Sequence, residues 1–172
     1  MSDLEKLYHE QQRKQLCLLH ALNNFFQREE FKKEELDRFC EEFDERTWFN
    51  PHRSIIGLGN YDVNVLLKCL ESRGLEGVWF DRRKSAASIN CDNVIGFVFN
   101  IPSDSFLSSI INGRHWFSVK KIGNIFYNLN SKLPEPTVIN DFILFTNEIL
   151  SKSDQNQLFL VLNPEKRDQV FI

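Results

Sequence analysis

The spacing of the apolar residues changes near Gly74, and this change decides the fold class. Before Gly74, apolar side chains recur every three or four positions, which predicts helices over residues 16–27, 31–43 and 61–72. After it, the pattern predicts strands, a hairpin around a Gly-Asn turn, one helix and a final strand, at residues 78–80, 94–99, 115–121 with 124–130, 137–150 and 157–162. We therefore expect an α+β fold in which helices pack mostly on one side of an antiparallel sheet.

Length, charge and cysteine content exclude several classes of protein. A chain of 172 residues predicts a single domain, residues 1–172. A net charge of -3 argues against a nucleic-acid-binding protein. The sequence has no apolar run of the roughly 18 residues that span a membrane, and its polar start does not resemble a secretory signal. The four scattered cysteines favour free thiols over disulfides or a zinc site. We expect a cytoplasmic monomer with neither metal nor cofactor.

One cysteine stands in a position that favours reactivity. Cys17 falls in the first turn of a predicted helix, where the helix dipole favours an anion and lowers a thiol pKa. Its neighbours Leu16 and Leu18 also allow a simpler interpretation, in which Cys17 is a small core residue. The other three cysteines, Cys40, Cys69 and Cys91, lie in helix or strand patterns and are expected to be inert core thiols.

The predicted hairpin brings a histidine and an asparagine together. If its loop is 122–123, His115 lies directly opposite Asn130; if the loop is 123–124, the two are diagonal neighbours. Either register places them on one face, with about 5 to 8 Å between their backbone positions. An asparagine oxygen that accepts a hydrogen bond from one imidazole N–H would leave the other nitrogen for a nucleophile. The alternative is a surface histidine and a turn asparagine.

Gln12 is the fourth candidate for the site. Its side-chain amide, together with the backbone N–H of Cys17, could stabilise an oxyanion. A glutamine in such a polar segment is otherwise solvated. His20 lies three residues after Cys17 and is interpreted as a packed or capping histidine, whereas His9 and His52 are interpreted as surface residues.

Several short motifs, in order and at suitable spacing, resemble the Josephin family from about residue 8 to residue 162. They are His9-Glu10-Gln11, residues 16–24, Gly57-x-Gly59-Asn60-Tyr61-Asp62, Arg114-His115-Trp116 and residues 127–133, and residues 50–54 and 79–83 look closest to the small stand-alone members. The resemblance implies a papain-like cysteine protease fold that acts on ubiquitin, with a projecting helical hairpin beside the cleft. It implies Cys17 as nucleophile, His115 as general base and acid, Asn130 as the residue that orients His115, and Gln12 in the oxyanion hole.

The resemblance also suggests residues that contact ubiquitin. Trp116 would help to line a narrow channel for a Gly-Gly tail. Val63 and Asn64 would lie on a surface that binds ubiquitin. They would stand beside Arg73, which occupies the position of a tryptophan in the ataxin type. In the hairpin, exposed Phe31, Trp48 and Phe49 would touch ubiquitin.

The resulting leading hypothesis is a deubiquitinating thiol protease that cuts the isopeptide bond after the C-terminal glycine of ubiquitin. One alternative is a non-catalytic ubiquitin-binding module on the same fold. Another is a cysteine acyltransferase or a thiol protease for a different ubiquitin-like modifier, since the chemistry as far as the thioester is shared.

Overall fold

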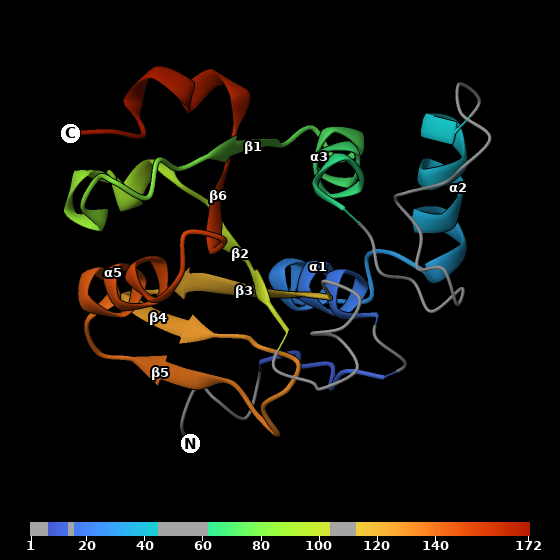
Figure 1. The fold of residues 1–172 in the computed structure, drawn as a ribbon, viewed down its shortest axis with the longest axis horizontal. Coiled ribbons are helices and arrows are strands. Elements are labelled where there is room, and N and C mark those ends of the chain that lie inside the picture. The colour runs from blue at the N-terminus through green and yellow to red at the C-terminus, as the bar shows by residue number, and fades with distance from the viewer. Residues whose placement is uncertain (1–6, 14–15, 45–61, 104–112) are drawn as a thin grey trace.

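The fold is organised around one six-stranded sheet in which every neighbouring pair of strands is antiparallel (Figure 1). The computed structural model describes residues 7–13, 16–44, 62–103 and 113–172. The strand order is β1-β6-β2-β3-β4-β5, with bounds Glu76–Trp79, Gln157–Leu162, Gly96–Pro102, Arg114–Ile122, Ile125–Asn128 and Thr137–Ile139. The α-helices are α1 (Cys17–Phe26), α2 (Lys33–Asp44), α3 (Val63–Ser72) and α5 (Phe142–Lys152), and short 3-10 helices are η2 (Ala86–Ser88), η3 (Cys91–Asn93) and η4 (Pro164–Gln169).

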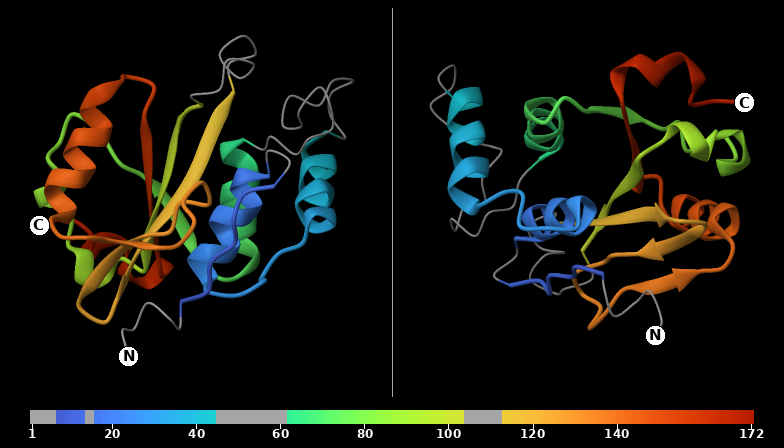
Figure 2. Two further views of the ribbon diagram at one scale, coloured as in Figure 1. Left: turned by 90° about the horizontal axis from the view of Figure 1, so that it is seen from below. Right: turned by 180° about the vertical axis from the view of Figure 1, so that it is seen from behind.

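Helices cover both faces of the sheet. Helices α1 and α3 lie on one face, with α2 outside α3, and α5 lies on the other (Figure 2). Alternate strand residues serve the two cores: Trp116 and Val98 pack with the α1 side, whereas Phe117 and Phe99 pack with the α5 side. The α+β prediction is confirmed. The expectation of helices mostly on one side describes α1 to α3 but omits α5, which covers the apolar second face of β2, β3 and β6.

Close contact between α1 and the sheet depends on a glycine. A Cβ atom added at Gly96 on β2 would lie 2.5 Å from a ring carbon of Phe25 and 3.2 Å from the carbonyl oxygen of Val119. Residue 96 therefore has to lack a side chain if Phe25 is to reach the strand. This contact sets the distance between α1, whose first residue is Cys17, and the strands beneath it.

Helix α3 begins and ends at the signals that the sequence carries. The Asp62 carboxylate accepts hydrogen bonds from the backbone N–H groups of Asn64 and Val65, at 2.9 and 3.3 Å. Gly74 has a φ of 73°, the left-handed conformation with which helices commonly end. Tyr61, predicted as the first helical residue, lies outside the described residues.

The predicted helix over residues 137–150 is wrong at its start. Residues Thr137–Ile139 form strand β5 and pair with β4, and α5 begins only at Phe142. The β-branched side chains of Thr137, Val138 and Ile139 favour a strand, and the free edge of β4 offers hydrogen-bond partners. Asp141 then caps α5 by accepting from Leu144 N–H at 2.9 Å.

Part of the projecting hairpin is described. Helix α2 stands at the outer edge of the described structure, next to α3 (Figure 1), whereas Trp48 and Phe49 lie outside the described residues. The expectation of an exposed Phe31 is wrong, because its side chain is 1% exposed. Both backbone polar groups of Phe31 bond to the Asn23 side chain, which holds this residue against α1.

Within the described residues, no helix has the length and apolar character that crossing a bilayer requires.

Candidate active site

The thiol of Cys17 lies against the backbone on both sides of His115. Cys17 is the first residue of α1 and is 4% exposed. Its Sγ donates to the carbonyl oxygen of Arg114 at 3.7 Å, and the backbone N–H of Trp116 also hydrogen-bonds to it. The helix start and the beginning of β3 therefore meet at this sulfur, although the two segments are about a hundred positions apart in the sequence.

His115 is fixed by Asn130. The pairing of Ile122 with Ile125 gives the hairpin the loop 123–124, so the second of the two predicted registers is the correct one. His115 Nε2 lies 2.9 Å from Asn130 Oδ1, and the same oxygen accepts from the backbone N–H of Lys132 at 3.0 Å. Because a backbone N–H only donates, this atom must be the amide oxygen, and Nε2 must carry the proton. Nδ1 is then the basic nitrogen of the neutral ring, as a general base requires.

Burial raises the pKa of the Cys17 thiol above its ordinary value. Hydrogen bonds from the backbone N–H groups of Trp116, Leu18 and Cys17 itself, and the charge of Lys132, favour the thiolate but do not outweigh burial. The expected lowering of the pKa by the helix start is therefore wrong in sign. In this state the thiol keeps its proton at neutral pH, and an attack by sulfur needs a base.

Gln12 lies beside the loop that carries Asn130. Its backbone N–H donates to the carbonyl oxygen of Ser131 at 2.8 Å, which joins the segment before α1 to the residue after Asn130. Its side-chain Oε1 is buried without a hydrogen-bond partner. The structure thus brings Gln12 close to the other candidates in the fold, and its role as an oxyanion donor stays a prediction.

Trp116 does not line a channel. Its side chain is 0% exposed and packs on the α1 side of the sheet, with its ring 6.1 Å from that of Phe159. His115 belongs to the opposite face and stacks near Phe117. The period of two in a strand predicts this opposition, because consecutive side chains point to opposite faces. Trp116 acts on the site through its backbone N–H.

The proposed ubiquitin-contact residues lie at the two ends of α3. Asn64 is exposed and borders a groove of about 530 Å³, here called the α3 groove, which also includes Phe43, Leu67 and Gly77. Val63 is half-buried and packs against the core. Arg73 caps the other end of the helix, roughly 15 Å away at 1.5 Å per residue. The expectation that Arg73 lies beside Val63 and Asn64 is therefore wrong.

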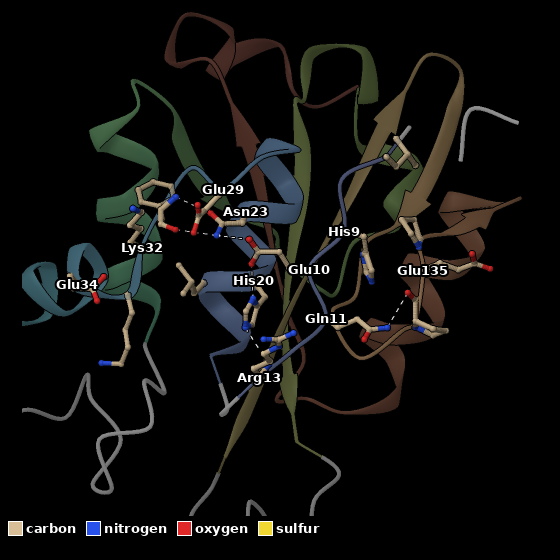
Figure 3. A pocket seen from close by; sticks show the side chains of 16 residues that line it. His9, Glu10, Gln11, Arg13, His20, Asn23, Glu29, Lys32, Glu34 and Glu135 are labelled. Atoms are coloured by element: carbon tan, nitrogen blue, oxygen red, sulfur yellow. Dashed lines mark hydrogen bonds and ion pairs between the residues drawn. The ribbon is translucent and has the colours of Figure 1, made fainter. Parts of the chain in front are cut away.

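A second groove, of about 840 Å³ and here called the outer groove, lies on the outward side of α1 (Figure 3). Residues from five segments border it: the stretch before α1, the outer face of α1, the connection from α1 to α2, the start of α2 and the loop after β4. Cys17, His115 and Asn130 are not among them, although Gln11 and Arg13 on either side of Gln12 are. Most of the side chains that line this groove are polar.

A buried polar network in this region is a feature that the sequence reasoning missed. The Glu10 carboxylate accepts from the Tyr8 hydroxyl, from His20 Nδ1 at 2.6 Å and from Asn23 at 3.0 Å. Burial opposes ionisation of Glu10, but these hydrogen bonds hold its pKa below the usual value. His20 Nε2 accepts from the backbone N–H of Arg13 at 3.2 Å, so of the two predicted alternatives the packed histidine is the correct one; among the described residues, no side chain caps the start of α1. The signal in the sequence was Asn23-Asn24, with His20, within a mostly apolar helix.

Asn24 links this network to the site. Its amide donates to the carbonyl oxygens of Glu10 and Leu129, both at 3.1 Å, and accepts from Glu10 N–H at 2.6 Å. Leu129 directly precedes Asn130, so one fully buried side chain connects α1, the segment before it and the Asn130 loop. His9, predicted to be a surface residue, is half-buried and bonds through Nε2 to the carbonyl oxygen of Leu133 at 2.9 Å. His52 lies outside the described residues.

The remaining cysteines are free thiols, with Cys40 and Cys69 fully buried and Cys91 half-buried. Over the described part of the chain, no group of three histidine, cysteine, aspartate or glutamate side chains is arranged to hold a metal ion.

A cysteine at the start of a helix, beside a strand histidine whose ring is fixed by an asparagine, defines the papain-like class of α+β proteins. Within that class, residues 12–162 match the family model described as Josephin. The chain therefore belongs to the Josephin family.

Curated relatives agree with this assignment. The chain is 42% identical over 165 residues to the Josephin-like protein of Drosophila melanogaster, covering 92% of this chain and 75% of the relative. It is 41% identical over 138 residues to Josephin-2 of Homo sapiens, covering 78% and 73% of the two chains. Similarity to ataxin-3 of Homo sapiens is lower, at 29% over 159 residues, covering 82% and 41%.

Proposed function

We propose that this protein is a deubiquitinating cysteine protease that hydrolyses the isopeptide bond after the C-terminal glycine of ubiquitin. The observation that carries the proposal is the His115–Asn130 hydrogen bond at the strand against which Cys17 lies. Membership of the Josephin family, whose relatives include ataxin-3, supports ubiquitin as the modifier.

The first step uses His115 as a base. Nδ1 of the neutral ring takes the Cys17 proton while Nε2–H stays bonded to Asn130, and the sulfur attacks the glycine carbonyl carbon. A base is required because the pKa of the buried thiol is raised. The imidazolium that forms is held in place by the Asn130 oxygen, which accepts a hydrogen bond from its Nε2–H.

The second step releases the lysine. Negative charge on the carbonyl oxygen would be stabilised by the backbone N–H of Cys17 and the side-chain amide of Gln12. As the carbon–nitrogen bond breaks, His115 gives its proton to the leaving amine and leaves a thioester between Cys17 and ubiquitin. Water, deprotonated by His115, then attacks the thioester carbon, and Cys17 leaves as a thiol with the proton from His115.

The test is covalent labelling with ubiquitin that carries a thiol-reactive group at its C-terminus. We expect the wild-type protein to gain the mass of one ubiquitin, and Cys17→Ala to gain none while keeping its circular dichroism spectrum. The matched control is Cys91→Ala, which removes the half-buried thiol and should be labelled like the wild type.

Other outcomes identify the alternative functions. A folded protein that binds ubiquitin without forming an adduct would support the non-catalytic binding module. An adduct with a probe built on a different ubiquitin-like modifier, and none with ubiquitin, would support the other thiol protease. Labelling that persists in Cys17→Ala would sink the assignment of the nucleophile.

A further inference from the structure

Among the described elements, helix α2 contacts mainly α3. It stands at the outer edge of the molecule, with α3 between it and the sheet (Figures 1 and 2). Its buried side chains Leu36, Phe39 and Cys40 belong to the same core cluster as Cys69 of α3. The position of α2 is therefore decided at its contact with α3.

One side chain joins α3 both to the connection that precedes α2 and to the first turn of α2. Arg73, at the C-terminal end of α3, donates from Nε to Glu30 Oε1 at 2.8 Å, within the connection that leads to α2. Nη1 and Nη2 donate to the two carboxylate oxygens of Glu35 on α2, at 2.9 and 3.1 Å. The guanidinium carbon also lies 4.1 Å from the ring centre of buried Phe31.

The arrangement uses the whole guanidinium group. Further donations to the Ser72 hydroxyl at 3.0 Å and the Glu30 carbonyl at 3.3 Å give every N–H of Arg73 a partner. Hydrogen bonding to Arg73 holds the pKa of the Glu30 carboxyl below its usual value. The charges also suit the helix ends, with a cation at the end of α3 and an anion at the start of α2. A lysine ammonium cannot reproduce a planar fork bonded to two carboxylates and a ring.

Helix α2 contributes to both grooves. Lys33 and Glu34 in its first turn border the outer groove, and Phe43 near its other end borders the α3 groove. A rotation of α2 on α3 would reshape the two surfaces together. We propose that Arg73 is a positioning residue, a latch that holds α2 on α3 and so sets the shape of both grooves.

Two buried thiols report on this latch. Cys40 of α2 and Cys69 of α3 are both fully buried in the core that the two helices share, whereas half-buried Cys91 lies elsewhere. Alkylation with iodoacetamide, followed cysteine by cysteine by mass spectrometry, should label Cys40 and Cys69 slowly in the wild type. In Arg73→Ala we expect both rates to rise at least about tenfold, since hydrogen bonds to charged groups stabilise by that order or more. The Cys91 rate should not change.

Four comparisons separate the latch from a general loss of stability. Arg73→Lys should restore only a small part of the protection. Glu35→Gln, which keeps the shape but removes the charge, should raise both rates. The matched control is Arg83→Ala, which removes a solvent-exposed arginine paired with Asp81 on another part of the surface, and should leave Cys40 and Cys69 protected. Raising the salt concentration should expose both thiols in the wild type and have little effect in Arg73→Ala.

Two results would overturn the latch. The first is labelling of Cys40 and Cys69 in Arg73→Ala at the wild-type rate. The second is a parallel rise at Cys91, which would show that the variant unfolds as a whole. Full protection in Arg73→Lys would show that charge alone suffices and that the fork geometry is irrelevant.

The consequence for ubiquitin rests on the proposed function. If α2 forms part of the ubiquitin-binding surface, Arg73→Ala should raise KM for a fluorogenic ubiquitin substrate several-fold and leave kcat within about twofold. If Arg73→Ala exposes both thiols but leaves KM unchanged, the position of α2 has no role in substrate binding. The alkylation result does not depend on activity. A wild-type protein that fails to cleave ubiquitin would therefore refute the proposed function, whereas the latch would still be tested by the alkylation rates of Cys40 and Cys69.

Discussion

The thiol of Cys17 is almost inaccessible to solvent at the first residue of α1, and this burial opposes its ionisation. Papain-like sites are often pictured with a preformed thiolate beside an imidazolium. Here the raised pKa of Cys17 indicates that its sulfur holds its proton in the free protein and loses it only during the attack.

The pH dependence of alkylation tests this protonation state. We expect the rate at which iodoacetamide modifies Cys17 to rise about tenfold per pH unit from pH 6 to beyond the ordinary thiol pKa of about 8.5. The measurement is cysteine-resolved mass spectrometry, with Cys91 as internal reference. A rate that is already constant between pH 5 and 7 would indicate a thiolate–imidazolium pair instead.

At this scale the sequence predicted that His115 and Asn130 share a face, because a two-residue hairpin loop sets their register, and their hydrogen bond confirms it. The catalytic roles of Cys17, His115 and Asn130 stay predictions. It could not give the sign of the Cys17 pKa shift, since burial depends on how α1 packs against β3. Trp116 was assigned to the wrong side even though strand alternation with His115 contained the answer.

Packing of α1 on the sheet decides where Cys17 meets β3, and Gly96 permits that packing. We expect Gly96→Ala to lower the free energy of unfolding by about 1 to 3 kcal/mol, because the new methyl group would overlap the buried Phe25 ring. Urea denaturation measures this change. The control is Gly123→Asn in the hairpin turn, where φ is +62° and nothing lies near the added Cβ atom; asparagine tolerates that conformation. Equal stability of Gly96→Ala and wild type would contradict the close contact.

Periodicity predicted α1, α2, α3, the β3–β4 hairpin and β6 nearly to their ends, since each has a long run or a clear turn or stop signal. It missed β5 because three β-branched residues are too short a run to establish a period beside the helix that follows. It also did not separate the two faces of β2, whose uninterrupted burial from Gly96 to Asn100 matches helices on both sides.

Because of its buried thiols, the molecule should lose stability as the pH rises into the alkaline range. Burial, followed by the charge of Glu35, raises the pKa of Cys69 well above its usual range. The folded protein therefore keeps a proton that the unfolded chain loses above about pH 8.5, and stability falls as pH rises through that value. We expect the stability difference between wild type and Cys69→Ala, measured with urea, to decrease by up to about 1.4 kcal/mol per pH unit above pH 8.5. A difference independent of pH would contradict a raised pKa.

The order of the strands was not predictable from the local pattern. The α+β class follows from the element order, whereas the insertion of β6 between β1 and β2 depends on which apolar faces fit together over long sequence separations.

That insertion has a consequence for synthesis on the ribosome. β6 pairs with both β1 and β2, so the sheet has a gap at this place until residues 157–162 have been made and have left the exit tunnel. Until then β1 lacks a neighbour, and β2 has one open edge. The sheet that supports the Cys17–His115 site would thus be complete only after β6 has been synthesised. A nascent chain would contain Cys17 long before it has the structure that activates this residue.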